Sequence, residues 1–123
     1  MDANFGIFPL MQLEALEQKA EDAAQFLKMI ASPPRLMLLC HMADKECSVG
    51  LLAEKTGMRM PTVSQQLSLL RAQGLVQTRR DGTTIYYRMN SQAARDVMDV
   101  LLQHFCSNEI ANTAPVYTAE VAE

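Results

Sequence analysis

Apolar residues recur every three or four positions along much of the chain, which is the spacing of an amphipathic helix. Helices are predicted over five stretches: residues 12–30, 34–43, 48–57, 61–73 and 92–106. Ser32 or Pro33 can begin the second helix. Ser48 can cap the third helix and Gly57 can end it. The second helix is apolar on nearly every side, which places it in the middle of a domain.

Two further segments, residues 75–80 and 84–89, flank Asp81-Gly82 and predict a β-hairpin. The third and fourth helices, their tight turn and this hairpin follow one another in the order of a winged helix-turn-helix. The predicted fold class is therefore mainly α with a β-hairpin wing (α+β), with four helices, two strands and a final helix. Such a fold places the second helix of its helix-turn-helix in the DNA major groove.

The helix at 61–73 is expected to bury Val63, Leu67 and Leu70 and to turn hydroxyl and amide side chains outward. These groups read base edges, and Gln can pair with adenine through both amide atoms. With nearby arginines and the wing tip, the predicted DNA contacts are Arg59, Thr62, Ser64, Gln65, Gln66, Ser68, Arg71, Arg79, Arg80 and Thr83. The expected ligand is double-stranded operator DNA. A protein interface is the alternative explanation of an uncharged helix face.

Charge changes the picture in the same direction. The chain carries a net charge of −3, but residues 57–88 hold five arginines and one acid, so this segment is +4 and the remainder −7. A basic patch on an acidic body attracts phosphate to one face. Arginine also suits bidentate contacts with phosphate and guanine. An ordinary solvated surface explains the charge alone equally well, so the helix-turn-helix pattern decides between the two.

The first and last helices have apolar faces broader than a small winged domain can cover. We expect a homodimer formed through these helices, because a two-fold protein also matches an inverted-repeat operator. The alternative is that the two helices pack on each other within one protomer. The domain prediction is an N-terminal extension at 1–11, a DNA-binding and dimerisation domain at 12–107, and a flexible tail at 108–123.

Three cysteines, odd in number and widely spaced, do not form a disulfide framework and favour a reducing cytoplasm. The apolar runs are too short to span a bilayer. The first residues lack the basic region of a secretory signal.

Several runs of the chain resemble the ArsR/SmtB family of winged-helix repressors. They are residues 31–36, 48–53, 63–67, 70–76 and 79–88, within a match over residues 15–107. The resemblance implies a homodimer that binds operator DNA and releases it when an inducer binds. Where many members have Ser-x-His-Leu in the reading helix, this chain has Ser64-Gln65-Gln66-Leu67, which leaves the operator sequence open.

Metal sensing, common in that family, is disfavoured by the residues present. The family's thiolate site uses a Cys-x-Cys pair, and Cys47 stands alone at that place. The last helix offers Asp96, Asp99 and His104 without the family's Asp-x-His spacing, and His41 is isolated. No metal and no cofactor are therefore predicted. An irregular site stays open as an alternative, built from Cys40, Cys47, Cys106 and a histidine.

Cys40 and Cys106 suggest a different sensor. A single buried Cys is most often a small apolar residue. The contexts Leu38-Leu39-Cys40-His41-Met42 and Leu102-Gln103-His104-Phe105-Cys106 nevertheless resemble the sulfide-responsive BigR/SqrR subgroup. That resemblance implies two sensor thiols that persulfides bridge through sulfur, weakening DNA binding. Cys47 matches neither position and is interpreted as a bystander, with its exposure left open.

Other functions are less favoured. A response to general oxidants, or no inducer at all, is the nearest alternative to sulfur sensing. An enzyme is not expected, because the chain has no Cys-x-x-Cys, no Ser-His-Asp order and no phosphate loop. A winged module that binds protein instead of DNA is disfavoured by the +4 segment.

Overall fold

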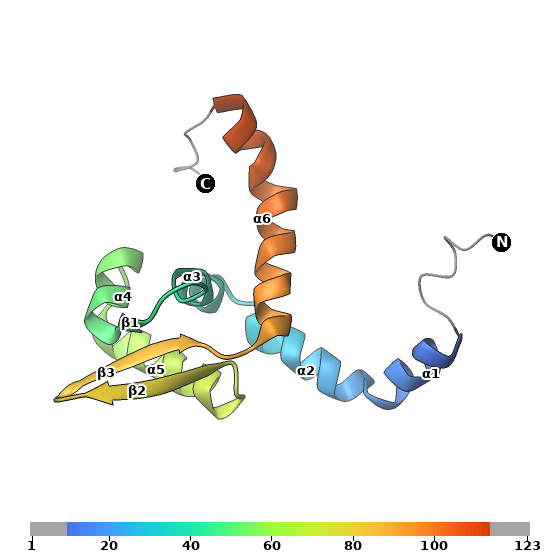
Figure 1. Ribbon diagram of the computed structural model, residues 1–123, viewed down its shortest axis with the longest axis horizontal. Coiled ribbons are helices and arrows are strands. Elements are labelled where there is room, and N and C mark those ends of the chain that lie inside the picture. Colours follow the sequence, from blue (N-terminus) through green and yellow to red (C-terminus); the bar gives the residue numbers. More distant parts are fainter. Residues whose placement is uncertain (1–9, 114–123) are drawn as a thin grey trace.

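A computed structural model describes the backbone of residues 10–113 and the side chains of residues 12–106. Six helices and a small sheet lie within this part (Figure 1). The helices are α1 (Leu10–Gln18), α2 (Ala20–Ile30), α3 (Pro33–His41), α4 (Val49–Thr56), α5 (Met60–Ala72) and α6 (Gln92–Thr113). The strands are β1 (Cys47–Ser48), β2 (Val76–Asp81) and β3 (Thr84–Met89). The predicted class, a mainly helical winged helix-turn-helix, is confirmed.

Local signals set the helix-turn-helix. The Ser48 hydroxyl accepts from the Leu51 amide at 3.1 Å and caps α4. Gly57 ends α4 in the left-handed region with φ 77°, where a Cβ would be strained. Pro61 lies in the first turn of α5, where its missing N–H costs no helical hydrogen bond. Both helices therefore begin and end close to the predicted residues.

The wing contains one strand more than predicted. Strands β2 and β3 pair antiparallel from Val76–Met89 to Asp81–Thr84, so the loop is Gly82-Thr83, one residue beyond the expected Asp81-Gly82. Gly82 takes φ 66°, as such a loop requires. The short β1 adds to the other edge of β3 and gives the order β1-β3-β2. A two-residue strand has too little alternation to be recognised from sequence.

A single core joins these elements. Leu38 and Leu39 of α3 are fully buried, and α3 contacts α4, α5 and α6, so α3 is central, as its composition predicted. The helix is not buried on every side, however, because Met37 is exposed. The fourteen core residues are Ile30, Leu38, Leu39, Met42, Cys47, Leu52, Val63, Leu67, Leu70, Leu75, Val76, Met89, Ala94 and Met98.

The first and last helices differ from their predicted extents. The single helix expected over residues 12–30 is broken at Lys19, whose φ of −109° and ψ of 12° leave the helical region. The Lys19 amide donates to the Leu16 carbonyl at 2.9 Å, so the last turn of α1 tightens. Helix α6 runs on to Thr113 instead of ending near Cys106. Of the predicted segments at 1–11 and 108–123, residues 1–9 and 114–123 lie outside the described residues.

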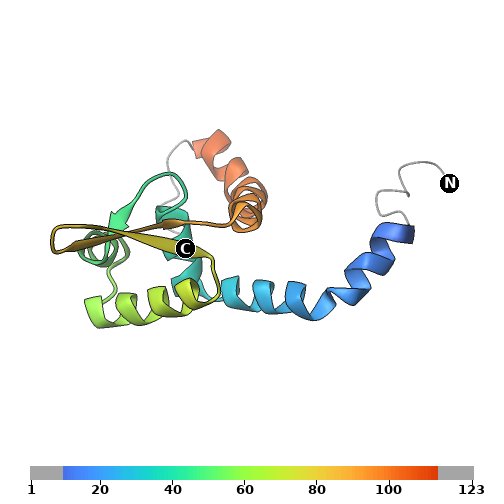
Figure 2. The same cartoon turned by 60° about the horizontal axis from the view of Figure 1, so that its bottom comes forward.

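Helices α1 and α2 form an arm that extends from the body on the side opposite the wing tip (Figure 2). The C-terminal part of α6 also stands clear of the helix-turn-helix (Figure 1). Large apolar side chains are exposed on both: Leu13, Leu16, Leu27, Val100, Leu102 and Phe105. The alternative, in which the predicted first helix and the predicted last helix cover each other within one protomer, is therefore wrong for the described residues.

Candidate DNA interface and thiol pair

Apart from Met60 and Leu69, the outer face of α5 is polar, and its polar side chains are largely without partners. Val63, Leu67 and Leu70 are fully buried, as predicted, which turns the rest of the helix outward. Thr62, Ser64, Gln65, Ser68 and Arg71 are exposed there, and Arg59 is exposed just before the helix. No side chain caps α5, so its first amide groups remain open to an anion.

Gln66 differs from its neighbours on α5. It is half-buried, and its Oε1 accepts from Nη1 of Arg35 on α3 at 3.0 Å. The same guanidinium donates through Nε to the Met29 carbonyl of α2 at 2.5 Å. One arginine thus connects three helices, a contact that no pattern in the sequence reveals.

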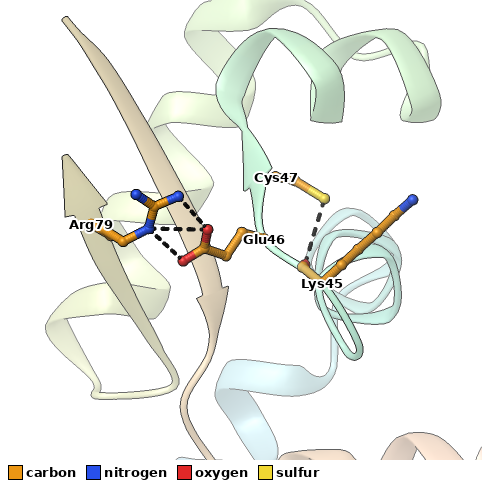
Figure 3. A network of polar contacts seen from close by, with 4 residues as sticks. All are labelled: Lys45, Glu46, Cys47 and Arg79. Atoms are coloured by element: carbon orange, nitrogen blue, oxygen red, sulfur yellow. Dashed lines mark hydrogen bonds and ion pairs between the residues drawn. The ribbon is translucent and has the colours of Figure 1, made fainter. Parts of the chain in front are cut away.

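The wing arginines also differ from one another. Arg80 and Thr83 are exposed at the tip, and their side chains have no polar partner in the part of the chain that the structure describes. Arg79 instead forms three hydrogen bonds of 2.7–3.1 Å with the Glu46 carboxylate (Figure 3). Its guanidinium lies 4.9 Å from the ring centre of Tyr86, its partner across the hairpin.

Glu46 was not recognised from the sequence, because it lies far from Arg79 along the chain. It directly precedes β1, and the unpredicted β1–β3 pairing brings it to the wing. The hydrogen bond from Arg79 holds the pKa of Glu46 below its usual range, so the pair is ionised at neutral pH. The charge of Arg79 is therefore largely balanced, whereas that of Arg80 is not.

The two predicted sensor thiols lie on α3 and α6. Neither is part of a disulfide, and both are half-buried. The Cys40 thiol donates to the Met98 sulfur at 3.4 Å, and Cys40 and Met98 line a cavity of about 220 Å³ between α3 and α6. Burial raises the pKa of Cys40, and the proximity of Cys106 raises it further. The fold thus brings together two thiols that are far apart in sequence.

The α3–α6 contact beside these thiols is fixed by Arg95. Its guanidinium donates to the Ala43 carbonyl and pairs with Asp44 at 3.1 Å. Both acceptors follow α3, whereas Arg95 lies in the first turns of α6.

Cys47 is separate from the thiol pair. It is buried, 1% exposed, and its sulfur lies 3.5 Å from the His41 carbonyl and 3.8 Å from that of Lys45. Figure 3 shows the thiol directed at the Lys45 backbone. Burial raises the pKa of Cys47, so its environment does not favour a reactive thiolate. Among the described residues no three His, Cys, Asp or Glu side chains gather as a metal site would require.

A winged helix-turn-helix with an exposed polar helix and a basic wing defines a DNA-binding regulatory protein. Residues 32–78 match the family described as bacterial regulatory protein, arsR family. A biofilm growth-associated repressor of Xylella fastidiosa is 41% identical over 101 residues, or 82% of this chain and 89% of the relative. The chain therefore belongs to the ArsR family and is a transcription regulator.

Solved structures agree with this assignment. The crystal structure of the repressor BigR from Xylella fastidiosa is similar with a TM-score of 0.72 and 40% identity, over 76% of this chain and 96% of that one. A homodimeric winged helix-turn-helix domain from Mycobacterium bovis, described as a possible ArsR-family regulator, is similar with a TM-score of 0.63 and 29% identity, over 83% and 94% of the two chains. No described helix of this protein is long and apolar enough to cross a membrane.

Proposed function

We propose that the protein is a homodimeric repressor that releases its operator when sulfur bridges Cys40 and Cys106. The observation that carries the proposal is the placement of these two thiols at the α3–α6 contact, close enough for one to affect the pKa of the other. The exposed face of α5, with its hydroxyl and amide groups, supports DNA reading. The similarity to repressors supports repression as the outcome of binding.

Dimerisation would use the arm and the outer part of α6. The Leu13, Leu16 and Leu27 side chains are about half exposed, and Phe105 is 73% exposed. Apolar surface of this extent ordinarily marks an interface. A two-fold dimer would present two copies of α5 to successive major grooves of an inverted repeat.

The sulfur chemistry balances without a further oxidant, because the sulfane sulfur of the inducer is itself reduced. The Cys40 thiolate attacks the sulfane sulfur of an organic persulfide, RSSH, forming Cys40–SSH and releasing RSH. The Cys106 thiolate then attacks the Cys40 sulfur and expels hydrosulfide, leaving a disulfide. With an organic trisulfide, RSSSR, attack on the central sulfur by each thiolate in turn releases two RSH and leaves one extra sulfur atom in the bridge.

Bridging would alter the α3–α6 contact. This contact determines how α6, which carries part of the proposed dimer surface, is placed relative to α5, the proposed DNA-reading helix. Helix α3 contacts α5 directly, and α6 carries the exposed Leu102 and Phe105. A changed angle between the helices would separate the two α5 copies by a distance that no longer matches successive grooves. Thiol state and operator affinity would then be coupled.

Operator affinity of the reduced and the trisulfide-treated protein tests the proposal, with mass spectrometry to detect a Cys40–Cys106 bridge. We expect affinity to fall at least about tenfold, the size of a typical allosteric coupling. Cys40→Ser and Cys106→Ser proteins should keep their affinity under treatment, and Cys47→Ser, the matched control, should respond like the unchanged protein. An unchanged affinity in the bridged protein would refute the switch.

Hydrogen peroxide serves as the second arm, because it distinguishes sulfur sensing from a general oxidant response. We expect trisulfide to bridge the thiols faster than peroxide does. A faster response to peroxide would favour the oxidant-responsive alternative. We also expect no catalytic turnover of thiol substrates.

A further inference from the structure

Arg35 holds one amide atom of a predicted DNA-reading residue. It lies in the first turn of α3, whose N-cap Ser32 accepts from the Arg35 backbone amide at 3.4 Å. Its Nε donates to the Met29 carbonyl and its Nη1 to Gln66 Oε1. Two bonds to different helices leave the half-buried guanidinium little rotational freedom. The Gln66 amide is therefore held by a fixed donor.

The chemistry of the pair determines which amide atom faces inward. A guanidinium has only donors, so the Gln66 atom beside it must be the oxygen and not the nitrogen. The Nε2 group of Gln66 has no hydrogen-bond partner among the described residues. None of the described side chains has a nitrogen or oxygen atom that is both buried and without a partner. The Nε2 donor therefore reaches solvent. Gln66 follows Thr62 by one turn, so this donor lies on the side of α5 that carries the exposed Thr62 hydroxyl.

We infer that Arg35 is a positioning residue that turns the amide donor of Gln66 toward DNA. This inference rests on the proposed DNA binding. Glutamine reads adenine by accepting from N6 and donating to N7 at once, which requires both amide atoms. With its oxygen turned inward to Arg35, Gln66 presents its Nε2 donor outward, so its favoured targets are acceptors in the major groove. Guanine presents two such acceptors, N7 and O6, and thymine presents O4.

Gln65 provides the internal comparison. It is exposed on the same helix, and both of its amide atoms are without a partner in the described residues. It therefore keeps the two-atom adenine contact, which the inward-turned oxygen of Gln66 disfavours. Two adjacent glutamines would thus have different base preferences, a distinction that the sequence alone does not show.

The test selects binding sites from a pool of random-sequence duplex DNA and then measures the relative affinity of every single-base change in the selected site. The proteins are the unchanged chain, Gln66→Ala, Gln66→Glu, Arg35→Met and, as the matched control, Gln65→Ala. The Gln66 position is the one whose preference Gln66→Ala abolishes. We expect guanine or thymine there in the unchanged protein, favoured about fivefold or more over adenine, the effect of one hydrogen bond.

Arg35→Met should reduce the preference over adenine at that one position at least about threefold, because the released amide can rotate. Preferences at the other positions of the site should not change. A merely structural role of Arg35 would instead weaken the preferences at all positions. Gln65→Ala should alter a different position. An adenine preference at the Gln66 position, or an unchanged preference in Arg35→Met, would overturn the inference.

Gln66→Glu keeps the test decisive if Arg35→Met does not fold. A carboxylate retains an acceptor for Arg35 but loses the outward donor, so we expect the preference to change to cytosine, whose N4 donates. Retention of guanine or thymine would overturn the inference. Failure to select any sequence would instead refute DNA reading itself, so the two failures are distinguishable.

Discussion

The two neighbouring wing arginines should contribute differently to DNA affinity. Arg80 is exposed with no ion pair in the described part of the chain, whereas Arg79 is bound by Glu46 through three hydrogen bonds. A cation that is already neutralised releases few counterions when it meets phosphate. We therefore predict that Arg80→Ala weakens the salt dependence of DNA binding much more than Arg79→Ala does.

The expected magnitude follows from the exposed cations. Among the arginines predicted to contact DNA, Arg59, Arg71 and Arg80 are exposed and without an ion pair in the described residues, so the proposed dimer offers six such charges. If each meets one phosphate, log K falls against log salt concentration with a slope of about −5. Arg80→Ala removes two contacts per dimer and should reduce the slope by about 2, while Arg79→Ala should reduce it by less than about 1.

Fluorescence anisotropy of a labelled duplex, titrated at several salt concentrations, measures these slopes. Glu46→Gln is the complementary variant: it frees Arg79 and should steepen the slope by up to about 2. Equal slopes for the Arg79 and Arg80 variants would refute the reasoning, as would an unchanged slope in Glu46→Gln.

Three further predictions concern the core, the dimer and the thiol. Leu67→Ala should reduce the free energy of unfolding by about 2–5 kcal/mol in chemical denaturation, because Leu67 is fully buried. Leu69 is exposed, so Leu69→Ala should change the free energy of unfolding by less than about 1 kcal/mol. Similar losses in both variants would contradict the core assignment. Phe105→Glu should convert a dimer to monomers in sedimentation analysis, and an unchanged mass would exclude this part of α6 from the interface. Burial and the nearby Cys106 raise the pKa of Cys40 above the usual range of a thiol. Its thiolate fraction and its rate of alkylation should therefore still be rising steeply at about pH 8.5, and a plateau by that pH would show the opposite shift.

Sequence alone predicted the parts of this molecule that local chemistry determines. Ser48 and Gly57 mark the ends of α4 by capping and by backbone geometry, and both act within a few residues. The spacing of Val63, Leu67 and Leu70 predicted the buried side of α5, and all three are buried. Helical period and caps are properties of a short segment, so one sequence is enough to reveal them.

Contacts between distant segments could not be predicted in this way. Glu46 meets Arg79, and Arg35 meets Gln66, only because the sheet order and helix packing bring them together. The burial of Cys47 follows from β1, which is too short to leave a pattern. The break at Lys19 has no glycine or proline beside it, and nothing in the structure explains it.

The central claim is that α5 reads base edges while the wing supplies affinity without sequence preference. The most direct test compares affinity for a selected site with affinity for unrelated duplex DNA, in the unchanged protein, Gln65→Ala and Arg80→Ala. We predict that Gln65→Ala lowers the ratio of the two affinities about tenfold and leaves non-specific binding intact, whereas Arg80→Ala weakens both alike. A ratio unchanged by Gln65→Ala would contradict the claim.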